Sequence, residues 1–266
     1  MLAEAPNPTR QLPARSFVAQ IMGMPISIHL RGPDARDAAV AAIVERVFAG
    51  LLEVDARFSP FRPDSEVCRI QRGELVLADA HPEVREVARL CDQASARTGG
   101  AFSATLPGPD GRPVFNPTGL VKGWAIQRAL EHLLADPALA GHDAMINAGG
   151  DIAARCQRTD TPAWVVAVED PRNRRRILRT MAMRTGAVAT SGTAARGRHI
   201  IDPARGTAAA GELLSATVVG PDLLWADAYA TAAFVLGRRA PAWLAGLEGH
   251  LGLLVTSDQQ VITTRG

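Results

Sequence analysis

The strand-forming segments of this chain are grouped together instead of being separated one by one by helices. Short apolar runs bounded by Gly, Pro and Asp cover residues 144–155, 163–169, 177–184, 187–190 and 213–219, all between two helical patterns. A parallel sheet needs a long, usually helical, crossover after each strand, and this order does not supply them. We therefore predict an α+β fold of mixed sheets and helices.

The helices are predicted from apolar residues that recur every three or four positions. This spacing indicates helices at about 34–56, 82–96, 119–134 and 221–236, and Gly99-Gly100 forms a C-terminal cap for the second of them. Residues 16–30 are predicted as one extended segment with a kink at 22–25, and residues 251–264 as a closing hairpin.

Length and composition favour one large folded unit. The chain has 266 residues, 47% of them hydrophobic, which is sufficient for a proper core. We expect a disordered leader at residues 1–15, followed by one domain over residues 16–266. Neither a signal peptide nor an apolar run of the ~20 residues that a membrane span requires is found. The prediction is a soluble, cytoplasmic protein without a membrane anchor.

Charge and cysteine usage exclude several functional classes. The net charge is only +2 at a pI of about 8.7, which argues against a nucleic-acid-binding protein. The densest basic run, Arg172 to Arg176, is predicted to be a solvated loop. The three cysteines are far apart and follow no Cys/His spacing, so neither a disulfide framework nor a zinc site is expected.

Two short segments carry candidate catalytic groups. Asp227 and Thr231 are four residues apart in a helical pattern, so both lie on one helix face, where a carboxylate and a hydroxyl can share a hard cation. The same pair is also typical of a solvated helix surface. His199 follows a loop with two arginines, where an imidazole can act as a base, and Asp202 nearby could merely shape a turn.

Three glycine-containing turns could hold an anion. They cover residues 98–103, 118–123 and 147–151. A glycine-rich turn at a helix N-terminus offers free backbone N–H groups and a positive dipole end, to which Lys122 would add a charge. None matches a known phosphate-binding fingerprint. The first could equally be only a helix cap, and the third only a bulge.

Taken together and in order, these segments resemble the ApbE family of FAD:protein FMN transferases. The resemblance runs from about Ile21 to Gly237. It is carried by Met22-Gly23, Phe58-Ser59 with Ser65-Glu66, Thr98 to Phe102, Gly119 to Gly123, Asn147 to Asp151, Thr190 to Gly192, His199 to Gly206 and Ala226 to Thr231.

The resemblance implies a T-fold-related, ApbE-like α+β fold, with FAD as substrate and Mg²⁺ as the essential ion. FMN would be joined through a phosphoester to a Thr or Ser of an acceptor flavoprotein, and AMP would leave. It further implies Asp227, Thr231 and the carbonyl of Gly119 as metal ligands and His199 as the base. The positions expected to contact FAD are Met22, Ala101, Phe102, Ser103, Asn116, Lys122 and Ile200.

Three positions depart from the family pattern. Ser103 and Asn116 stand where carboxylates are usual, and Ala230 stands where a second acid can lie beside the metal. These replacements predict altered FAD affinity or a weaker metal site. Two alternatives therefore remain beside the transferase: a Mg²⁺-dependent FAD pyrophosphatase that gives FMN and AMP, and a non-catalytic FAD-binding protein. The transferase ranks first because His199, Asp227 and Thr231 are all present.

Overall fold

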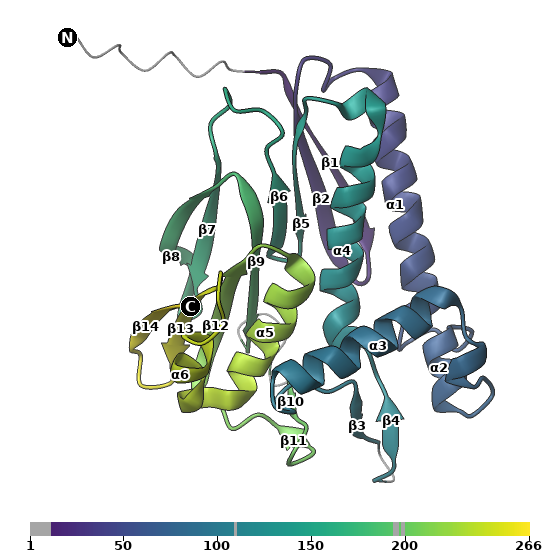
Figure 1. Ribbon diagram of the computed structural model, residues 1–266, viewed down its shortest axis with the longest axis vertical. Helices are drawn as coiled ribbons and strands as arrows, with labels where there is room; N and C mark the ends of the chain where they lie inside the picture. Colours follow the sequence, from purple (N-terminus) through teal and green to yellow (C-terminus); the bar gives the residue numbers. More distant parts are fainter. Residues whose placement is uncertain (1–11, 109–110, 194–196, 198–199) are drawn as a thin grey trace.

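The computed structural model describes residues 12–108, 111–193, 197 and 200–266 (Figure 1). The helices are α1 (Ala38–Phe58), α2 (Glu66–Gln71), α3 (Pro82–Arg97), α4 (Thr118–Ala135), α5 (Leu223–Leu236) and α6 (Ala240–Leu244). The strands are β1 (Ala14–Ile21), β2 (Met24–Arg31), β3 (Thr105–Pro107), β4 (Pro113–Phe115), β5 (Asp143–Ala148), β6 (Asp151–Arg155), β7 (Trp164–Asp170), β8 (Asn173–Met183), β9 (Thr185–Gly192), β10 (Ile201–Asp202), β11 (Thr207–Ala208), β12 (Leu213–Gly220), β13 (Leu251–Thr256) and β14 (Val261–Arg265).

One antiparallel sheet organises the molecule. Its eight strands run in the order β1-β2-β5-β6-β9-β12-β13-β14, and every neighbouring pair is antiparallel. Hairpins connect three of these pairs, β1–β2, β5–β6 and β13–β14, and α4 and α5 lie in the longer connections to β5 and β13. The α+β prediction is therefore confirmed.

Helices cover one face of the sheet (Figure 1). Helix α5 packs on β9 and β12, α4 packs beside it, and α1 packs on α4. The sequence of α5 explains its position, because small alanines such as Ala226, Ala230 and Ala233 are fully buried and allow the helix to lie close to the strands. The main core fills the space between these helices and the sheet.

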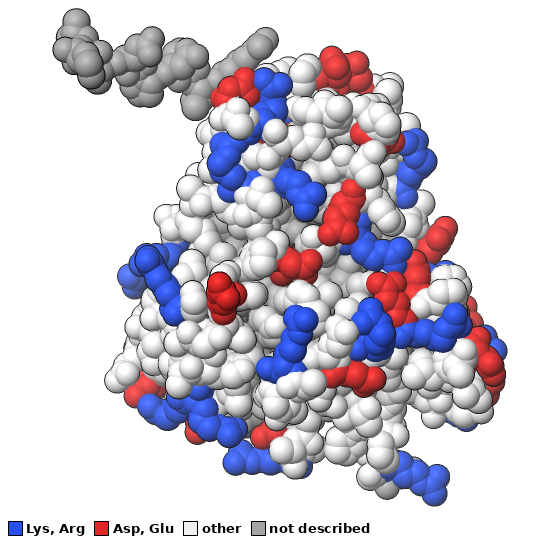
Figure 2. Space-filling view, viewed as in Figure 1, with Lys and Arg blue, Asp and Glu red and all other residues white. Residues whose placement is uncertain are grey.

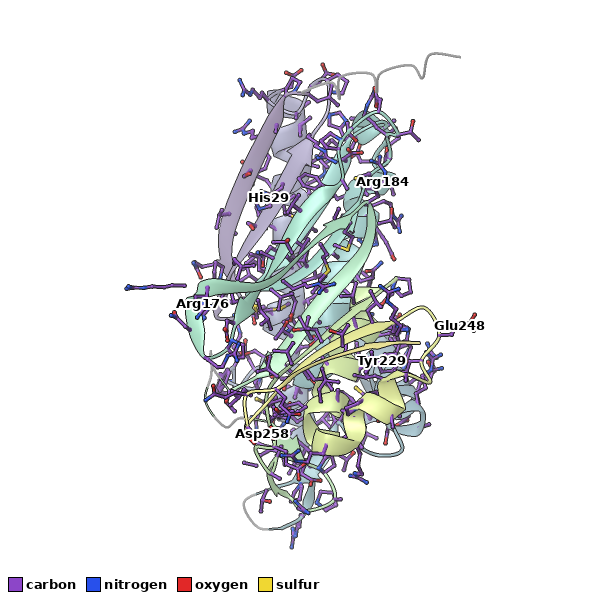
Figure 3. All side chains as sticks on the ribbon, turned by 90° about the vertical axis from the view of Figure 1, so that its left-hand side faces the viewer. His29, Arg176, Arg184, Tyr229, Glu248 and Asp258 are labelled. Atoms are coloured by element: carbon purple, nitrogen blue, oxygen red, sulfur yellow. The ribbon has the colours of Figure 1, made fainter. Side chains whose placement is uncertain are left out.

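The β7–β8 hairpin covers the opposite face of the sheet (Figure 3). Val166, Val168 and Met183 of the hairpin form a second apolar cluster with Ile152 and Val188 of the sheet. The hairpin also corrects one prediction. The basic run at 172–176 is exposed, as expected, but most of it lies in β8 and not in a loop, and Arg176 points away from the molecule.

The predicted kinked strand over residues 16–30 is wrong. It is the β1–β2 hairpin, whose turn at Met22 and Gly23 has φ of 55° and 70°. A kinked strand and a hairpin share the same Gly and Pro signals, and a methionine with positive φ is rare enough to hide the turn. The segment 144–155 is likewise the β5–β6 hairpin, reversed at Gly149-Gly150. The four predicted helices and the closing β13–β14 hairpin are confirmed within a few residues.

Charges of both signs are interspersed on the face shown in Figure 2. No helix among the described residues is both long and apolar enough to cross a bilayer. The three cysteines form no disulfide. Residues 1–11 of the predicted leader lie outside the described residues, and β1 begins at Ala14, so the boundary between leader and domain stays a prediction.

Candidate active site

A cavity of about 750 Å³ opens at one end of α4 and α5, between the β5–β6 turn and the loop after α3. Its lining includes residues from every separated motif of the sequence that the structure describes. The predicted site residues that line it are Met22, Ala101, Phe102, Ser103, Asn116, Gly119, Lys122, Ile200, Asp227 and Thr231. The predicted base, His199, lies outside the described residues.

A close contact between α4 and α5 brings the charged groups of the site together. Gly123 of α4 faces the beginning of α5, where an added Cβ would lie 2.8 Å from the carbonyl oxygen of Leu223. The same Cβ would lie 3.0 Å from the Cβ of Asp227. Only glycine permits this approach, which sets Lys122 next to Asp227.

Asp227 is a carboxylate inside an apolar helix. It is 4% exposed, and its Oδ2 makes no hydrogen bond to the part of the chain that the structure describes. Burial raises the pKa of Asp227 to about 7, with the negative charge of Asp151 acting in the same direction and Lys122 acting against both. A buried carboxylate oxygen without a partner is costly, and a bound cation would remove this cost.

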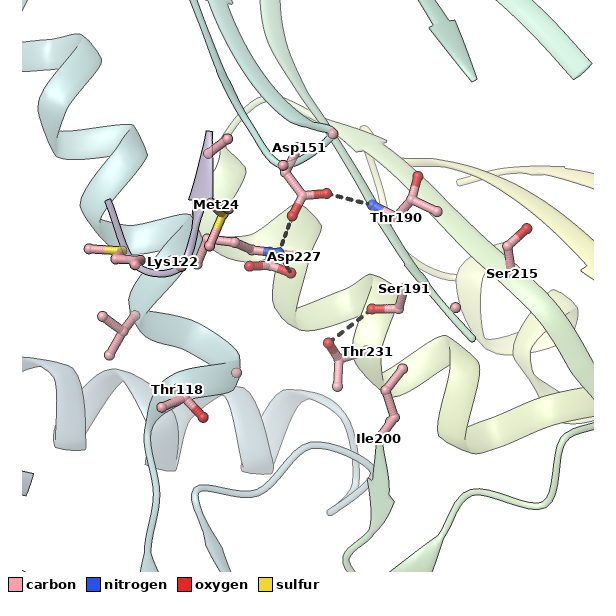
Figure 4. Close-up of a pocket in the computed structure, with 18 of the residues that line it drawn as sticks. Met24, Thr118, Lys122, Asp151, Thr190, Ser191, Ile200, Ser215, Asp227 and Thr231 are labelled. Carbon is pink, nitrogen blue, oxygen red and sulfur yellow. Dashed lines mark hydrogen bonds and ion pairs between the residues drawn. The ribbon is translucent and has the colours of Figure 1, made fainter. Parts of the chain in front are cut away.

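Lys122 lies between two carboxylates (Figure 4). Its ammonium group is in close ion-pair contact with Asp151, and its Nζ lies 3.5 Å from Oδ1 of Asp227. Both carboxylates are almost completely buried, whereas the Lys122 side chain is partly exposed to the cavity. The site therefore holds one positive and two negative groups in a region of low dielectric, where their interactions are strong.

Asp151 is placed by the β5–β6 turn. Gly149 and Gly150 have φ of 62° and 105°, which favour glycine, and the Gly150 N–H donates to Oδ1 of Asn147 at 2.9 Å. The turn directs Asp151 toward β9, where its Oδ1 accepts the backbone N–H of Thr190 at 2.8 Å. One oxygen of Asp151 is thus fixed by the sheet, and the other contacts Lys122 (Figure 4).

Thr231 lies one helical turn after Asp227 and shares a hydrogen bond of 3.1 Å with the hydroxyl of Ser191. This contact orients the Thr231 side chain toward the cavity (Figure 4). Asp227, Thr231 and Gly119 all line the cavity and could offer a carboxylate, a hydroxyl and a carbonyl oxygen, the ligand type that a hard cation prefers. Among the described residues, no cluster of three His, Cys, Asp or Glu side chains offers a metal site.

The loop after α3 forms another wall of the cavity. Thr98 stabilises this loop, because its hydroxyl donates to the Ala94 carbonyl at 2.8 Å and accepts the Phe102 N–H at 3.0 Å. Phe102 is buried against the first turn of α4, where a Cβ at Gly119 would lie 3.2 Å from its ring. The cavity therefore has an apolar wall beside the N-terminus of α4.

The two residues that replace carboxylates are engaged in local structure. The Ser103 hydroxyl accepts the Thr105 N–H at 3.0 Å and donates to the Thr105 carbonyl at 2.9 Å. Oδ1 of Asn116 accepts from the N–H and the hydroxyl of Thr118 at 3.2 and 2.6 Å, in the turn that leads into α4. Ala230 is fully buried. Asp202 accepts the Ala204 N–H at 3.0 Å, as expected for a residue that shapes a turn.

Sequence reasoning missed Asp151 and Ser191 as members of the site. Both belong to motifs recognised in the sequence, but neither was selected as a site residue. Their partners are Lys122 and Thr231, which lie on other elements far away in the sequence. The local sequence signal for Asp151 is a carboxylate directly after the Gly149-Gly150 pair.

Known proteins resemble this chain in sequence and in fold. The chain is 25% identical to the FAD:protein FMN transferase of Salmonella typhimurium over 98% of this chain and 90% of that protein. It is 24% identical to the FAD:protein FMN transferase of Haemophilus influenzae over 73% of this chain and 72% of that protein. The fold matches the ApbE protein of Thermotoga maritima with a TM-score of 0.81 at 20% identity, covering 95% of this chain and 97% of that one.

A second solved structure, the flavin transferase ApbE from Vibrio cholerae, matches with a TM-score of 0.77 at 20% identity, covering 96% and 98% of the two chains. At this identity the two structures show the fold alone. The model of the ApbE family matches residues 22–108 and 114–255, which is most of the sequence. The chain belongs to the ApbE family.

Proposed function

We propose that this protein is a Mg²⁺-dependent FAD:protein FMN transferase, which joins FMN through a phosphoester to a Thr or Ser of an acceptor flavoprotein and releases AMP. The observation that carries the proposal is the single cavity that gathers the separated motifs around Asp227, whose Oδ2 has no hydrogen-bond partner among the described residues. The relatives named FAD:protein FMN transferase support the same activity.

The cavity suits a dinucleotide with a negatively charged centre. Its volume of about 750 Å³ lies within the range of small-molecule sites. Thr118 and Gly119 line it at the N-terminal turn of α4, where the positive end of the helix dipole favours a diphosphate. Lys122 adds a positive charge beside them. The apolar surface near Phe102 can pack against a ring of the substrate.

A Mg²⁺ ion held by Asp227, Thr231 and the carbonyl of Gly119 would neutralise charge on the diphosphate during displacement at phosphorus. The protein's own task is to hold the two reactants in line. The acceptor hydroxyl oxygen forms a bond to the FMN phosphorus, the bond from that phosphorus to the AMP oxygen breaks, and the hydroxyl proton passes to a base. We propose His199 as that base.

The test is a transfer assay with FAD, Mg²⁺ and an acceptor flavoprotein that the Salmonella or Haemophilus enzyme modifies. We expect a mass increase of one FMN on an acceptor Thr or Ser and one AMP for each FMN attached. The control is Asp227→Asn, which should form neither product. No modified acceptor from this protein, in parallel with modification by the relative, would contradict the proposal.

The same assay separates the alternatives. Free FMN and AMP formed without an acceptor would indicate a pyrophosphatase. Tight FAD binding that persists in EDTA, without AMP, would indicate a binding protein. The departures from the family pattern at Ser103, Asn116 and Ala230 are the reason to run the reaction without an acceptor and to measure FAD binding in EDTA. The cytoplasmic location of the protein and its acceptor stays a prediction.

A further inference from the structure

Lys122 lies near two carboxylates, and its ammonium group is closer to one of them than to the other. The ammonium group is in direct contact with Asp151 but lies 3.5 Å from Oδ1 of Asp227. Oδ2 of Asp227 makes no hydrogen bond within the described residues. The residue that would bind a cation therefore keeps one oxygen free although a lysine lies beside it.

Asp151 can hold Lys122 in this position because it is itself fixed. The β5–β6 turn sets its backbone, and the Thr190 N–H on β9 anchors its Oδ1 at 2.8 Å. The side chain is 4% exposed, so water competes little for its other oxygen. Asp227 is equally buried and lies on α5, so the two carboxylates approach Lys122 from different elements.

We propose that Asp151 is a positioning residue that draws the ammonium group of Lys122 away from Asp227 and so leaves the Asp227 carboxylate available to a divalent cation. The inference rests on the cation site of the proposed function. Without the Asp151 charge, Asp227 would be the nearest remaining carboxylate for Lys122. The Lys122 side chain is only 24% exposed, so its ammonium group would pair with Asp227 and compete with the cation.

A simpler role for Asp151 must be separated from this one. A second carboxylate near the site would attract a cation through its own charge, whatever Lys122 does. That direct effect is the same with or without Lys122. The positioning effect exists only when the ammonium group is present, so a double-mutant cycle distinguishes the two.

The experiment measures the dissociation constant of Mn²⁺ alone for four proteins: wild type, Asp151→Asn, Lys122→Met and the double variant. Asparagine is a matched replacement, because its Oδ1 can still accept the Thr190 N–H while the charge is removed. We expect Asp151→Asn to weaken Mn²⁺ binding about tenfold when Lys122 is present and less than about threefold in the Lys122→Met background, as for contacting charged residues.

Equal losses in the two backgrounds, or no loss with Lys122 present, would overturn the inference and leave the proposed cation site intact. A wild-type protein that binds no Mn²⁺ would contradict the cation site itself, and the inference with it. Thermal unfolding of each variant checks that it is folded. If Asp151→Asn does not fold, Asp151→Glu replaces it in the cycle, because this substitution moves the charge by one methylene group. It should weaken Mn²⁺ binding when Lys122 is present, and the Lys122→Met substitution should again suppress this loss of affinity.

Discussion

Replacing Asp227 by asparagine should stabilise the protein in a pH-dependent manner while abolishing its activity. Burial raises the pKa of this carboxyl from 3.8 to about 7. The folded state therefore holds the proton more tightly than the unfolded state does. The free energy of unfolding of the wild type falls as the pH rises from the unfolded-state pKa of 3.8 to the folded-state pKa of about 7, and the loss is complete above about pH 7.

The magnitude follows from the same interval. Each pH unit between the two pKa values costs about 1.4 kcal/mol, so the ionised Asp227 lowers the free energy of unfolding by about 3 kcal/mol between pH 5 and pH 8. Asparagine does not ionise and lacks this loss. All other titrating groups are common to both proteins, so the difference in stability between variant and wild type reports Asp227 together with its interactions with Lys122 and Asp151.

Urea unfolding in EDTA at pH 5 and pH 8 measures this difference. The stability of Asp227→Asn relative to the wild type should increase by about 3 kcal/mol from pH 5 to pH 8. Mg²⁺ at a hundred times its dissociation constant should then stabilise only the wild type at pH 8, by about 2.7 kcal/mol. A difference that stays constant with pH, or that grows toward acid pH, would refute the reasoning about this buried carboxyl.

Three further substitutions test particular contacts. Gly123→Ala should destabilise the protein by about 1–3 kcal/mol in urea unfolding, because the new methyl group would lie 2.8 Å from the Leu223 carbonyl oxygen; an unchanged midpoint would contradict this. Ser65→Ala removes the buried cap of α2 and should lower the free energy of unfolding by about 1 kcal/mol or more, without changing the affinity for FAD in a titration. Ser191→Ala frees the Thr231 hydroxyl and should weaken Mn²⁺ binding several-fold, about 1 kcal/mol, while thermal unfolding in EDTA changes little. Equal Mn²⁺ affinity would show that Ser191 does not orient Thr231.

Much of the fold was predictable because its helices follow local periodicity. The helix predicted at 82–96 is α3 at Pro82–Arg97, since a proline at the start and Gly99-Gly100 at the end mark both boundaries. The β1–β2 hairpin was not predictable from the same rules. Its turn uses Met22 with φ of 55°, a conformation that no propensity assigns to methionine. Helices as short as α2 carry too few turns for a periodic signal.

Many of the residues that line the cavity were predictable from the sequence, but the contacts between them were not. The motifs in order identified the residues that line the cavity, including Asp227 and Thr231 on one face of α5. The role of Asp151 could not be seen, because its ion pair with Lys122 depends on how α4 and the β5–β6 turn meet in space. Tertiary packing decides which carboxylate Lys122 contacts, and spacing along the chain does not report it.

A crystal structure with FAD and Mn²⁺, with the ion located from its anomalous signal, would test the cation site most directly. We predict one peak within ligand distance of the Asp227 carboxylate and the Thr231 hydroxyl, against the diphosphate of FAD bound in the cavity. FAD bound in that cavity with no peak beside Asp227, or with the ion held elsewhere, would contradict the assignment.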